Sequence, residues 1–193
     1  MESLPKYEDE NRKVFDKYVE LFQLTKEDLA KPILDVGAGN GEFIHFLRHE
    51  LNNSHAFGVE ENSRKVNSGE DGMIIADGFE LPFSDESFEI VVSKDFLPMF
   101  TSSVEKSEDI FNELIRVTKS GGRIIGNIYT PETVIEESNQ DIYKGDLKFQ
   151  EAFNEMYKGS VGFKIFLEGL EEKGYSIDYN KFDYRIVITL KKP

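Results

Sequence analysis

The chain has 193 residues, and its 37 acidic against 23 basic residues give a formal net charge of −14. The length predicts one domain, and 39% hydrophobic residues are enough for a sizeable core, which excludes global disorder. The absence of cysteine excludes disulfide scaffolds and thiol nucleophiles. No apolar run is long enough to span a membrane, and the first residues do not look like a signal peptide. We therefore expect a soluble, cytoplasmic protein.

The charge distribution also bears on partners. Acidic residues gather at residues 8–10, 85–89 and 131–155, and the sequence has no basic stripe. Polyanions would be repelled at long range, which argues against a nucleic acid or an anionic membrane as partner. The oligomeric state is left open.

Short apolar runs alternate with helical patterns along most of the chain. Val14, Tyr18 and Leu21 recur at helical spacing and predict a leading helix over residues 8–24. The strands are predicted at residues 33–36, 56–59, 73–76, 88–92, 123–129, 175–179 and 184–190.

Further helices are expected between these strands. One begins at Gly41 and carries Phe43, Ile44, Leu47 and Leu51 on one face. A second covers residues 107–118 and is stopped by Ser120, Gly121 and Gly122; a third carries Phe163, Phe166, Leu167 and Leu170 and ends at Gly174.

The alternation predicts the fold class: an α/β protein with a parallel sheet that helices cover on both faces. The last two strands are joined by a short turn and must be antiparallel. We expect a single domain over residues 1–193, in which residues 1–30 form a leading helical segment. Residues 131–160 are acidic and irregular, and they are expected to form an insert on the substrate side.

The strongest motif is a glycine-rich turn between the first strand and the following helix. Gly37, Gly39 and Gly41 follow Asp35 in the pattern D-x-G-x-G-x-G. Glycines let the backbone turn sharply and approach a ligand closely, and the next helix points free N–H groups at the turn. The dinucleotide fingerprint G-x-G-x-x-G would need a glycine at position 42, where the chain has Glu42, and the G-K-[ST] of a nucleotide P-loop is missing.

Acidic residues follow the next two strands as well. Glu60 ends the second strand, where a carboxylate can accept hydrogen bonds from both hydroxyls of a ribose. Asp77 and Gly78 follow the third strand, where an acid can accept a hydrogen bond from an adenine amino group. Strand ends that converge on one crevice are typical of nucleoside binding in open α/β sheets.

These segments resemble class I, seven-stranded S-adenosylmethionine-dependent methyltransferases, most closely the type 11 subgroup. Residues 33–41 (ILDVGAGNG) look like motif I of that family, residues 58–60 (GVE) like its acidic second strand end, and residues 76–89 (ADGFELPFSDESFE) like its third motif. Residues 114–122 look like the segment before its fifth strand, with Ser120 where proline is usual. The resemblance implies a three-layer, Rossmann-like sheet in the strand order 3-2-1-4-5-7-6.

The resemblance also implies a cofactor and residue roles. The cofactor would be S-adenosyl-L-methionine, and the acceptor a small molecule. Asp35 would steady the glycine turn and the methionine amine, Glu60 would hold the ribose, and Asp77 would meet the adenine, with Phe79 or Leu81 near the ring. The full set of implied cofactor-binding residues is Asp35, Gly37, Ala38, Gly39, Gly41, Glu60, Asp77, Gly78 and Ser93.

The sequence departs from the family after the fourth strand. Many relatives carry a histidine pair there, whereas this chain has Lys94 and Asp95. Asp95 is the candidate catalytic residue, as a proton acceptor or orienting group, and a helix-capping or solvated aspartate is the alternative. Methyl transfer needs little acid–base help, because alignment and exclusion of water supply most of the acceleration.

Two alternatives follow from the same residues. A non-catalytic module that binds S-adenosylmethionine or another nucleoside, with a regulatory or partner role, would use the same strand ends. His45 and His49 have a spacing that can ligate a metal, but the glutamate of an H-E-x-x-H motif is missing and the third histidine, His55, lies on the next strand. A solvated helix face is the better interpretation, and no metal is expected.

Overall fold

The computed structural model describes residues 6–66, 71–95, 104–128, 147–182 and 185–193. The described residues form a seven-stranded sheet in the order β3-β2-β1-β4-β5-β7-β6, which confirms the predicted strand order. Its strands are β1 (Ile33–Val36), β2 (Ala56–Glu60), β3 (Met73–Ile75), β4 (Phe88–Ser93), β5 (Thr118–Ile128), β6 (Ser176–Phe182) and β7 (Arg185–Lys191).

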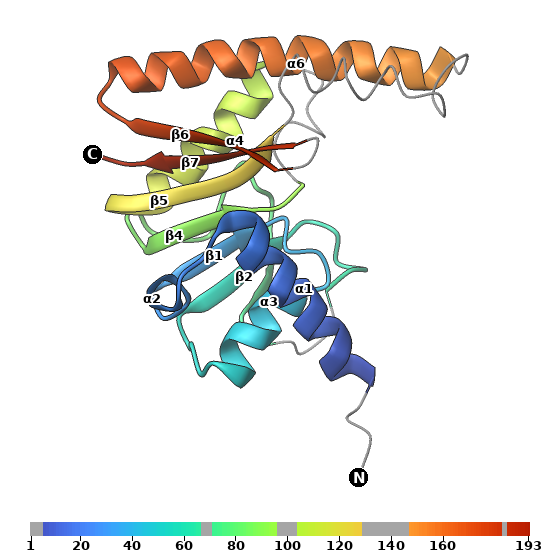
Figure 1. Cartoon of the computed structure of the whole chain (residues 1–193), viewed down its shortest axis with the longest axis vertical. Coiled ribbons are helices and arrows are strands. Elements are labelled where there is room, and N and C mark those ends of the chain that lie inside the picture. Colours follow the sequence, from blue (N-terminus) through green and yellow to red (C-terminus); the bar gives the residue numbers. More distant parts are fainter. Residues whose placement is uncertain (1–5, 67–70, 96–103, 129–146, 183–184) are drawn as a thin grey trace.

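The pairing of the strands follows the sequence-based expectation. Strands β1 to β5 pair in parallel, and β7 is antiparallel to both β5 and β6. Parallel neighbours require crossovers, and helices lie between β1 and β2 and between β4 and β5. The carboxyl ends of β1, β2, β3 and β4 therefore lie at the same edge of the sheet, where the motifs of the sequence come together (Figure 1).

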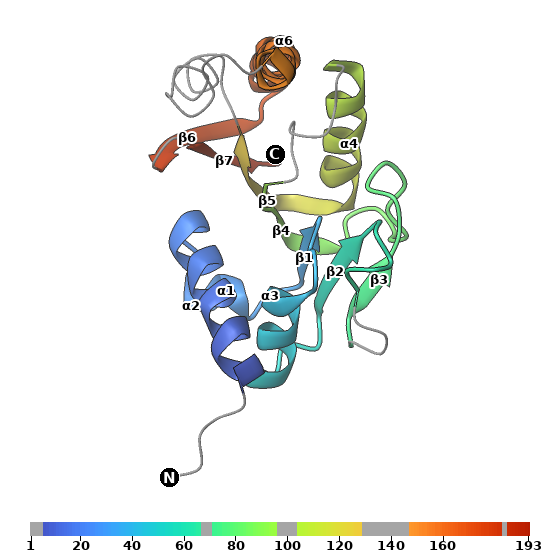
Figure 2. The ribbon, with the colours of Figure 1, turned by 90° about the vertical axis from the view of Figure 1, so that its right-hand side faces the viewer.

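Helices cover the sheet on both faces, so the fold has three layers (Figure 2). One face carries the N-terminal helices and the other carries the two long helices that follow β4 and β5. The helices are α1 (Lys6–Phe22), α2 (Lys26–Leu29), α3 (Glu42–His45), the π-helix η1 (Phe46–Glu50), α4 (Val104–Val117) and α6 (Leu147–Glu172).

Each face of the sheet has its own hydrophobic core. Phe15, Tyr18 and Phe43 belong to the core beneath α1 and α3, where the ring of Tyr18 stacks on Phe43 with centroids 4.3 Å apart. On the other face, Phe111 of α4 meets Phe163 of α6 edge to face at 5.3 Å. Burial of these large rings stabilises the two helical layers against the sheet.

The helix after the glycine turn differs from its prediction. The helical face was expected to include Leu51, but Leu51 is 44% exposed. The π-helix η1 explains this, because the N–H of Leu51 donates to the carbonyl of Phe46, five residues back. The wider turn carries Leu51 off the buried face that Phe43, Ile44 and Leu47 occupy.

Two other boundaries were also predicted wrongly. α4 ends at Val117 and β5 begins at Thr118, five residues before the predicted start at Arg123. The pairing of β4 with β5 shifts between Phe88 and Ile90, and Gly121 at φ 75° lies within that irregularity. Residues 131–160 were expected to be irregular and only partly helical; residues 147–160 form the first half of the continuous helix α6, and residues 131–146 lie outside the described residues.

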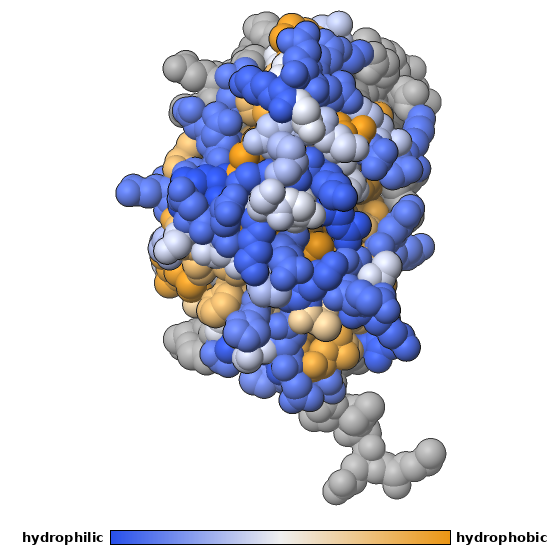
Figure 3. Space-filling view, turned by 90° about the vertical axis from the view of Figure 1, so that its left-hand side faces the viewer, coloured by the Kyte–Doolittle hydropathy of each residue, from blue (hydrophilic) through white to orange (hydrophobic). Residues whose placement is uncertain are grey.

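The outer surface agrees with the acidic composition. Figure 3 shows a face that is mostly hydrophilic, with separate hydrophobic spots. Among the described residues, no helix is long and apolar enough to cross a membrane.

Candidate functional site at the carboxyl edge of the sheet

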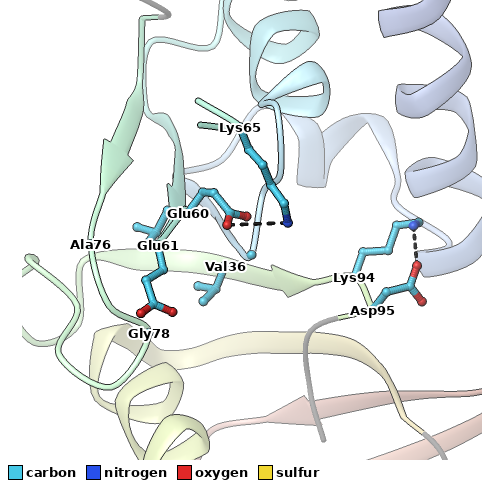
Figure 4. Close-up of a pocket in the computed structure, with 10 residues that line it drawn as sticks. Val36, Glu60, Glu61, Lys65, Ala76, Gly78, Lys94 and Asp95 are labelled. Carbon is cyan, nitrogen blue, oxygen red and sulfur yellow. Dashed lines mark hydrogen bonds and ion pairs between the residues drawn. The ribbon is translucent and has the colours of Figure 1, made fainter. Parts of the chain in front are cut away.

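A cavity of about 440 Å³ opens at the carboxyl ends of β1 to β4. This volume lies within the range of small-molecule sites. Figure 4 shows the acidic tip of β2 on one side of it and the residues after β4 on the other. The lining residues are Val36, Gly37, Val59, Glu60, Glu61, Lys65, Ala76, Gly78, Lys94 and Asp95.

The glycine-rich turn after β1 is held against β2 by its backbone. The N–H groups of Gly37 and Ala38 both donate to the carbonyl of Val59, at 2.9 and 3.0 Å. Gly37, Gly39 and Gly41 all have positive φ, at 81°, 61° and 85°, a region that residues with a side chain rarely adopt. The turn therefore has the sharp bend that the sequence predicted.

The glycines of the turn face different surroundings. A Cβ at Gly41 would lie 2.8 Å from Sδ of Met73, so this glycine allows the turn to pack against β3. A Cβ at Gly39 would meet no atom within 4 Å. Gly39 therefore leaves open space that a ligand can enter, while Gly41 serves packing.

Glu60 joins the turn to the tip of β2. Its Oε2 accepts from the N–H of Gly39 at 3.0 Å, and its Oε1 accepts from the N–H of Asn62 at 3.0 Å. The ammonium of Lys65 lies 3.7 Å from the same Oε1. A carboxylate has about four acceptor positions, so two backbone donors fix its orientation and leave capacity for hydroxyl groups in the cavity.

Two polar side chains of the site are buried without hydrogen-bond partners among the described residues. Both carboxyl oxygens of Asp35 and the hydroxyl of Ser93 are in this state, and both residues are fully buried. Buried polar groups normally have partners. Asp35 and Ser93 do not line the cavity themselves, but their chain neighbours Val36 and Lys94 do, so these two polar groups lie behind its wall.

Burial raises the pKa of Asp35 to about 7. The nearby Tyr18 hydroxyl and Lys94 ammonium oppose this rise, while Glu42 and Glu60 add to it. Burial, followed by the charge of Asp35, also raises the pKa of Tyr18. Asp35 does not line the cavity and makes no hydrogen bond to the glycine turn in the described part of the chain. It lies beneath the cavity floor.

The residues after β4 form a connected cluster. Nζ of Lys94 lies 2.6 Å from Oδ2 of Asp95. Asp95 donates its N–H to Oδ1 of Asn127 at 2.9 Å and accepts from Nδ2 of Asn127 at 2.8 Å. Both carboxylate oxygens of Asp95 are thus engaged, which fixes the orientation of the group.

Sequence reasoning missed Asn127 and assigned Tyr18 only to the apolar face of the leading helix. Asn127 interrupts the apolar run of β5, and an amide in a buried strand was the available signal. Tyr18 of α1 is buried, and the ammonium of Lys94 lies 5.9 Å from its ring centroid.

The three residues predicted to lie near the adenine do not line the cavity; they are Asp77, Phe79 and Leu81. Asp77 is exposed, does not line the cavity, and accepts from the N–H of Phe79 at 3.0 Å. Phe79 is 39% exposed and Leu81 is buried in the core, so neither lines the cavity. Of the described residues between β3 and β4, Ala76 and Gly78 line the cavity. Ala38 and Gly41 are buried within the turn.

No group of three potential metal ligands occurs in the described ranges.

An open, largely parallel sheet with a glycine turn after β1 and an acid at the tip of β2 defines an α/β protein that binds a nucleoside-type ligand. Residues 34–126 match the model of a family described as a methyltransferase domain. This region is thus similar to a methyltransferase domain, and the described part of the chain as a whole has the seven-strand sheet order predicted for class I S-adenosylmethionine-dependent methyltransferases. The family predicted from the motifs is thereby confirmed.

Solved structures share the fold at low sequence identity. An S-adenosylmethionine-dependent methyltransferase from Mesorhizobium loti has a TM-score of 0.62 and 16% identity, over 92% of this chain and 100% of that chain. A methyltransferase from Methanosarcina mazei has a TM-score of 0.60 and 18% identity, over 91% and 97%. Magnesium protoporphyrin IX methyltransferase from Synechocystis, solved with bound SAH, has a TM-score of 0.59 and 12% identity, over 100% and 90%. No curated protein matches the sequence.

Proposed function

We propose that the protein transfers a methyl group from S-adenosyl-L-methionine to a small-molecule acceptor, and that the cavity at the carboxyl edge binds this cofactor. The observation that carries the proposal is the Glu60 carboxylate, which two backbone N–H groups orient at the tip of β2 in a cavity that the glycine turn also lines. When bound, the cofactor supplies an electrophilic methyl group on a positively charged sulfur.

The roles of this chain's residues follow from their positions. Glu60 would accept from the ribose hydroxyls, while Gly37 and Gly78 line the wall without side chains that would obstruct a ligand. Asp35 and Ser93, buried beneath the cavity, would contribute charge and polarity rather than direct contact. The lining has three carboxylates, those of Glu60, Glu61 and Asp95, against the two ammonium groups of Lys65 and Lys94, and this small excess of negative charge suits a cationic sulfonium.

The choice of a small acceptor rests on size and charge. The cavity that the described residues enclose, about 440 Å³, lies in the size range of small-molecule sites and can hold a nucleoside-type ligand. The net charge of −14 and the lack of a basic stripe disfavour a nucleic acid acceptor. A cytoplasmic location is part of the same proposal, supported by the charged, cysteine-free composition.

Isothermal titration with S-adenosylhomocysteine (SAH), the demethylated product, tests cofactor binding without knowledge of the acceptor. We expect one site per chain for SAH and no binding of NAD. Transfer of label from methyl-labelled S-adenosylmethionine to separate pools of metabolites, RNA and protein tests the acceptor class. Label in the metabolite pool supports the proposal; label in RNA or protein alone contradicts the acceptor class, and SAH binding without any transfer favours a non-catalytic module.

A further inference from the structure

The thioether of Met73 on β3 lies between the glycine turn and β2. In the parallel pairing of β2 with β3, Met73 is the register partner of Gly58. A Cβ at Gly58 would lie 2.5 Å from Sδ of Met73, and a Cβ at Gly41 would lie 2.8 Å from the same atom. The sulfur therefore occupies space that two glycines leave free, one in the turn and one in β2.

This space has little room for a further atom. The same Cβ at Gly58 would lie 2.9 Å from the side chains of Ala38 and Ile44, and both of these side chains are buried. Ala38 of the turn and Ile44 of α3 thus border the space that the sulfur fills. Because protein interiors are close-packed, an added atom there forces neighbouring side chains or backbone to move.

Met73 also lies at the border of the fold. The side chain is only partly buried, and β3 is the outermost strand at its end of the sheet (Figure 2). Ile75, two residues further along the same strand, is 57% exposed. A small oxidant in solution can therefore approach this thioether, and accessible thioethers are the ones that oxidise to sulfoxides.

The turn that Met73 contacts also orients the carboxylate of the candidate site. The N–H of Gly41 donates to the carbonyl of Ala38 at 3.0 Å, which closes the turn. Gly39 lies between these two residues, and its N–H donates to Oε2 of Glu60. A displacement of Gly41 would therefore move the N–H group that holds Glu60.

We propose that Met73 is a site of reversible oxidation, and that its sulfoxide weakens cofactor binding by displacing the glycine turn. Hydrogen peroxide is the oxidant: a lone pair of Sδ forms a bond to one peroxide oxygen, the O–O bond breaks, and the other oxygen leaves as water. The sulfur loses two electrons and the peroxide gains them. A dithiol reverses the change through a methionine sulfoxide reductase; it becomes a disulfide, and the sulfoxide oxygen leaves as water.

The sulfoxide disturbs the packing in two ways. Its oxygen needs room that the contacts with Gly41 and Gly58 do not leave. It also places a polar group beside the apolar side chains of Ala38 and Ile44, where burial without a hydrogen bond is unfavourable. The loss of cofactor affinity rests on the proposed function, whereas the oxidation and the movement of the turn can be measured without a ligand.

Treatment of the whole protein with hydrogen peroxide tests the proposal. Mass spectrometry of peptides shows whether Met73 has gained one oxygen, and isothermal titration of the same sample measures SAH binding. We expect the oxidised protein to bind SAH about tenfold more weakly, and reduction by methionine sulfoxide reductase to restore the affinity. A folded protein whose Met73 stays unmodified in peroxide, or whose Met73 sulfoxide binds SAH normally, would overturn the proposal.

Two variants assign the effect to Met73, because the chain has four methionines, at positions 1, 73, 99 and 156. Met73→Leu keeps an apolar side chain of similar volume but forms no sulfoxide, so peroxide should leave its SAH affinity unchanged. The double variant Met99→Leu and Met156→Leu keeps Met73, and should lose affinity in peroxide as the unchanged protein does. An equal loss of affinity in Met73→Leu would place the effect at another residue and overturn the assignment.

Hydrogen–deuterium exchange separates this inference from the proposed function. Oxidation of Met73 should speed exchange in residues 37–41 of the ligand-free protein, since the N–H of Gly39 loses its fixed position beside Glu60. If the unchanged protein binds SAH but oxidation of Met73 alters neither this exchange nor the affinity, only this inference fails. If the unchanged protein binds no SAH while folded, the proposed function fails, and the effect of Met73 on cofactor binding fails with it.

Discussion

The N–H of Gly39 donates a 3.0 Å hydrogen bond to Oε2 of Glu60, so the glycine turn after β1 and the tip of β2 are joined through a carboxylate. These residues are far apart in sequence, and each had been singled out separately for ligand binding. The bond shows that they form one unit: the carboxylate that would hold a ribose also fixes the turn beside it.

Replacement of Glu60 by alanine should therefore weaken binding of SAH. We expect a loss of ~1–3 kcal/mol, because the ribose hydroxyls and the N–H of Gly39 lose a shared acceptor. Isothermal titration measures the effect. Glu61→Ala is the matched control, because Glu61 lines the same cavity and its substitution removes the same charge. Equal losses of SAH affinity in both variants would mean that Glu60 acts only through its charge.

Asp35→Asn should change how stability depends on pH. The pKa of Asp35 is about 7 in the folded protein and about 4 in an unfolded chain, so the folded state binds more protons between these values. Stability of the unchanged protein should then fall as pH rises from about 4 through 7. The asparagine side chain does not titrate, so the variant should gain roughly 2–4 kcal/mol relative to the unchanged protein between pH 5 and pH 8.

Urea unfolding at several pH values measures this difference. Asp178→Asn, a substitution of an exposed aspartate on β6, serves as the control, and its stability should follow that of the unchanged protein. If the free energy of unfolding depends on pH in the same way in Asp35→Asn and in the unchanged protein, the Asp35 carboxyl is not perturbed by burial.

Gly58→Ala should destabilise the protein by ~1–3 kcal/mol through overpacking. A Cβ there would lie 2.5 Å from Sδ of Met73 and 2.9 Å from the side chains of Ala38 and Ile44. Gly169→Ala is the opposite case, because Gly169 lies within α6 and a Cβ there meets no atom within 4 Å. It should stabilise the protein by ~0.5–1 kcal/mol. Thermal unfolding measures both effects. Melting temperatures that shift in the same direction in both variants would contradict this account.

Arg116→Met should loosen the segment that follows β3. The Arg116 guanidinium donates to the carbonyls of Leu81 and Phe83 and to Asp85 and Glu113, so it ties this segment to α4. We expect a loss of ~2–3 kcal/mol in the free energy of unfolding. The control is Arg12→Met, which removes an exposed pair with Asp16 and should cost less than ~1 kcal/mol. Similar losses in both variants would rule out this role of Arg116.

Much of the fold could be predicted because its signals are local. Short apolar runs, the glycine turn and the acids at strand ends all report on neighbouring residues, and the parallel sheet follows from their alternation. The position of Glu60 beside Gly39 could be predicted for the same reason, since both lie at carboxyl ends of adjacent strands.

The remaining features depend on contacts between distant segments or on small backbone changes. The bond between Asp95 and Asn127 joins the ends of β4 and β5 and leaves no periodic pattern in the sequence. In the π-helix that turns Leu51 outward, each hydrogen bond spans one residue more than in an α-helix. Hydrophobic spacing does not resolve this difference over so short a helix. Helix α6 begins in an acidic segment whose composition alone is typical of an irregular loop.

A crystal structure of the protein with SAH tests the central claim most directly. The account predicts SAH in this cavity, with the ribose hydroxyls on the carboxylate of Glu60 and the glycine turn alongside. Electron density for SAH outside this cavity, or a ribose that does not contact Glu60, would contradict it.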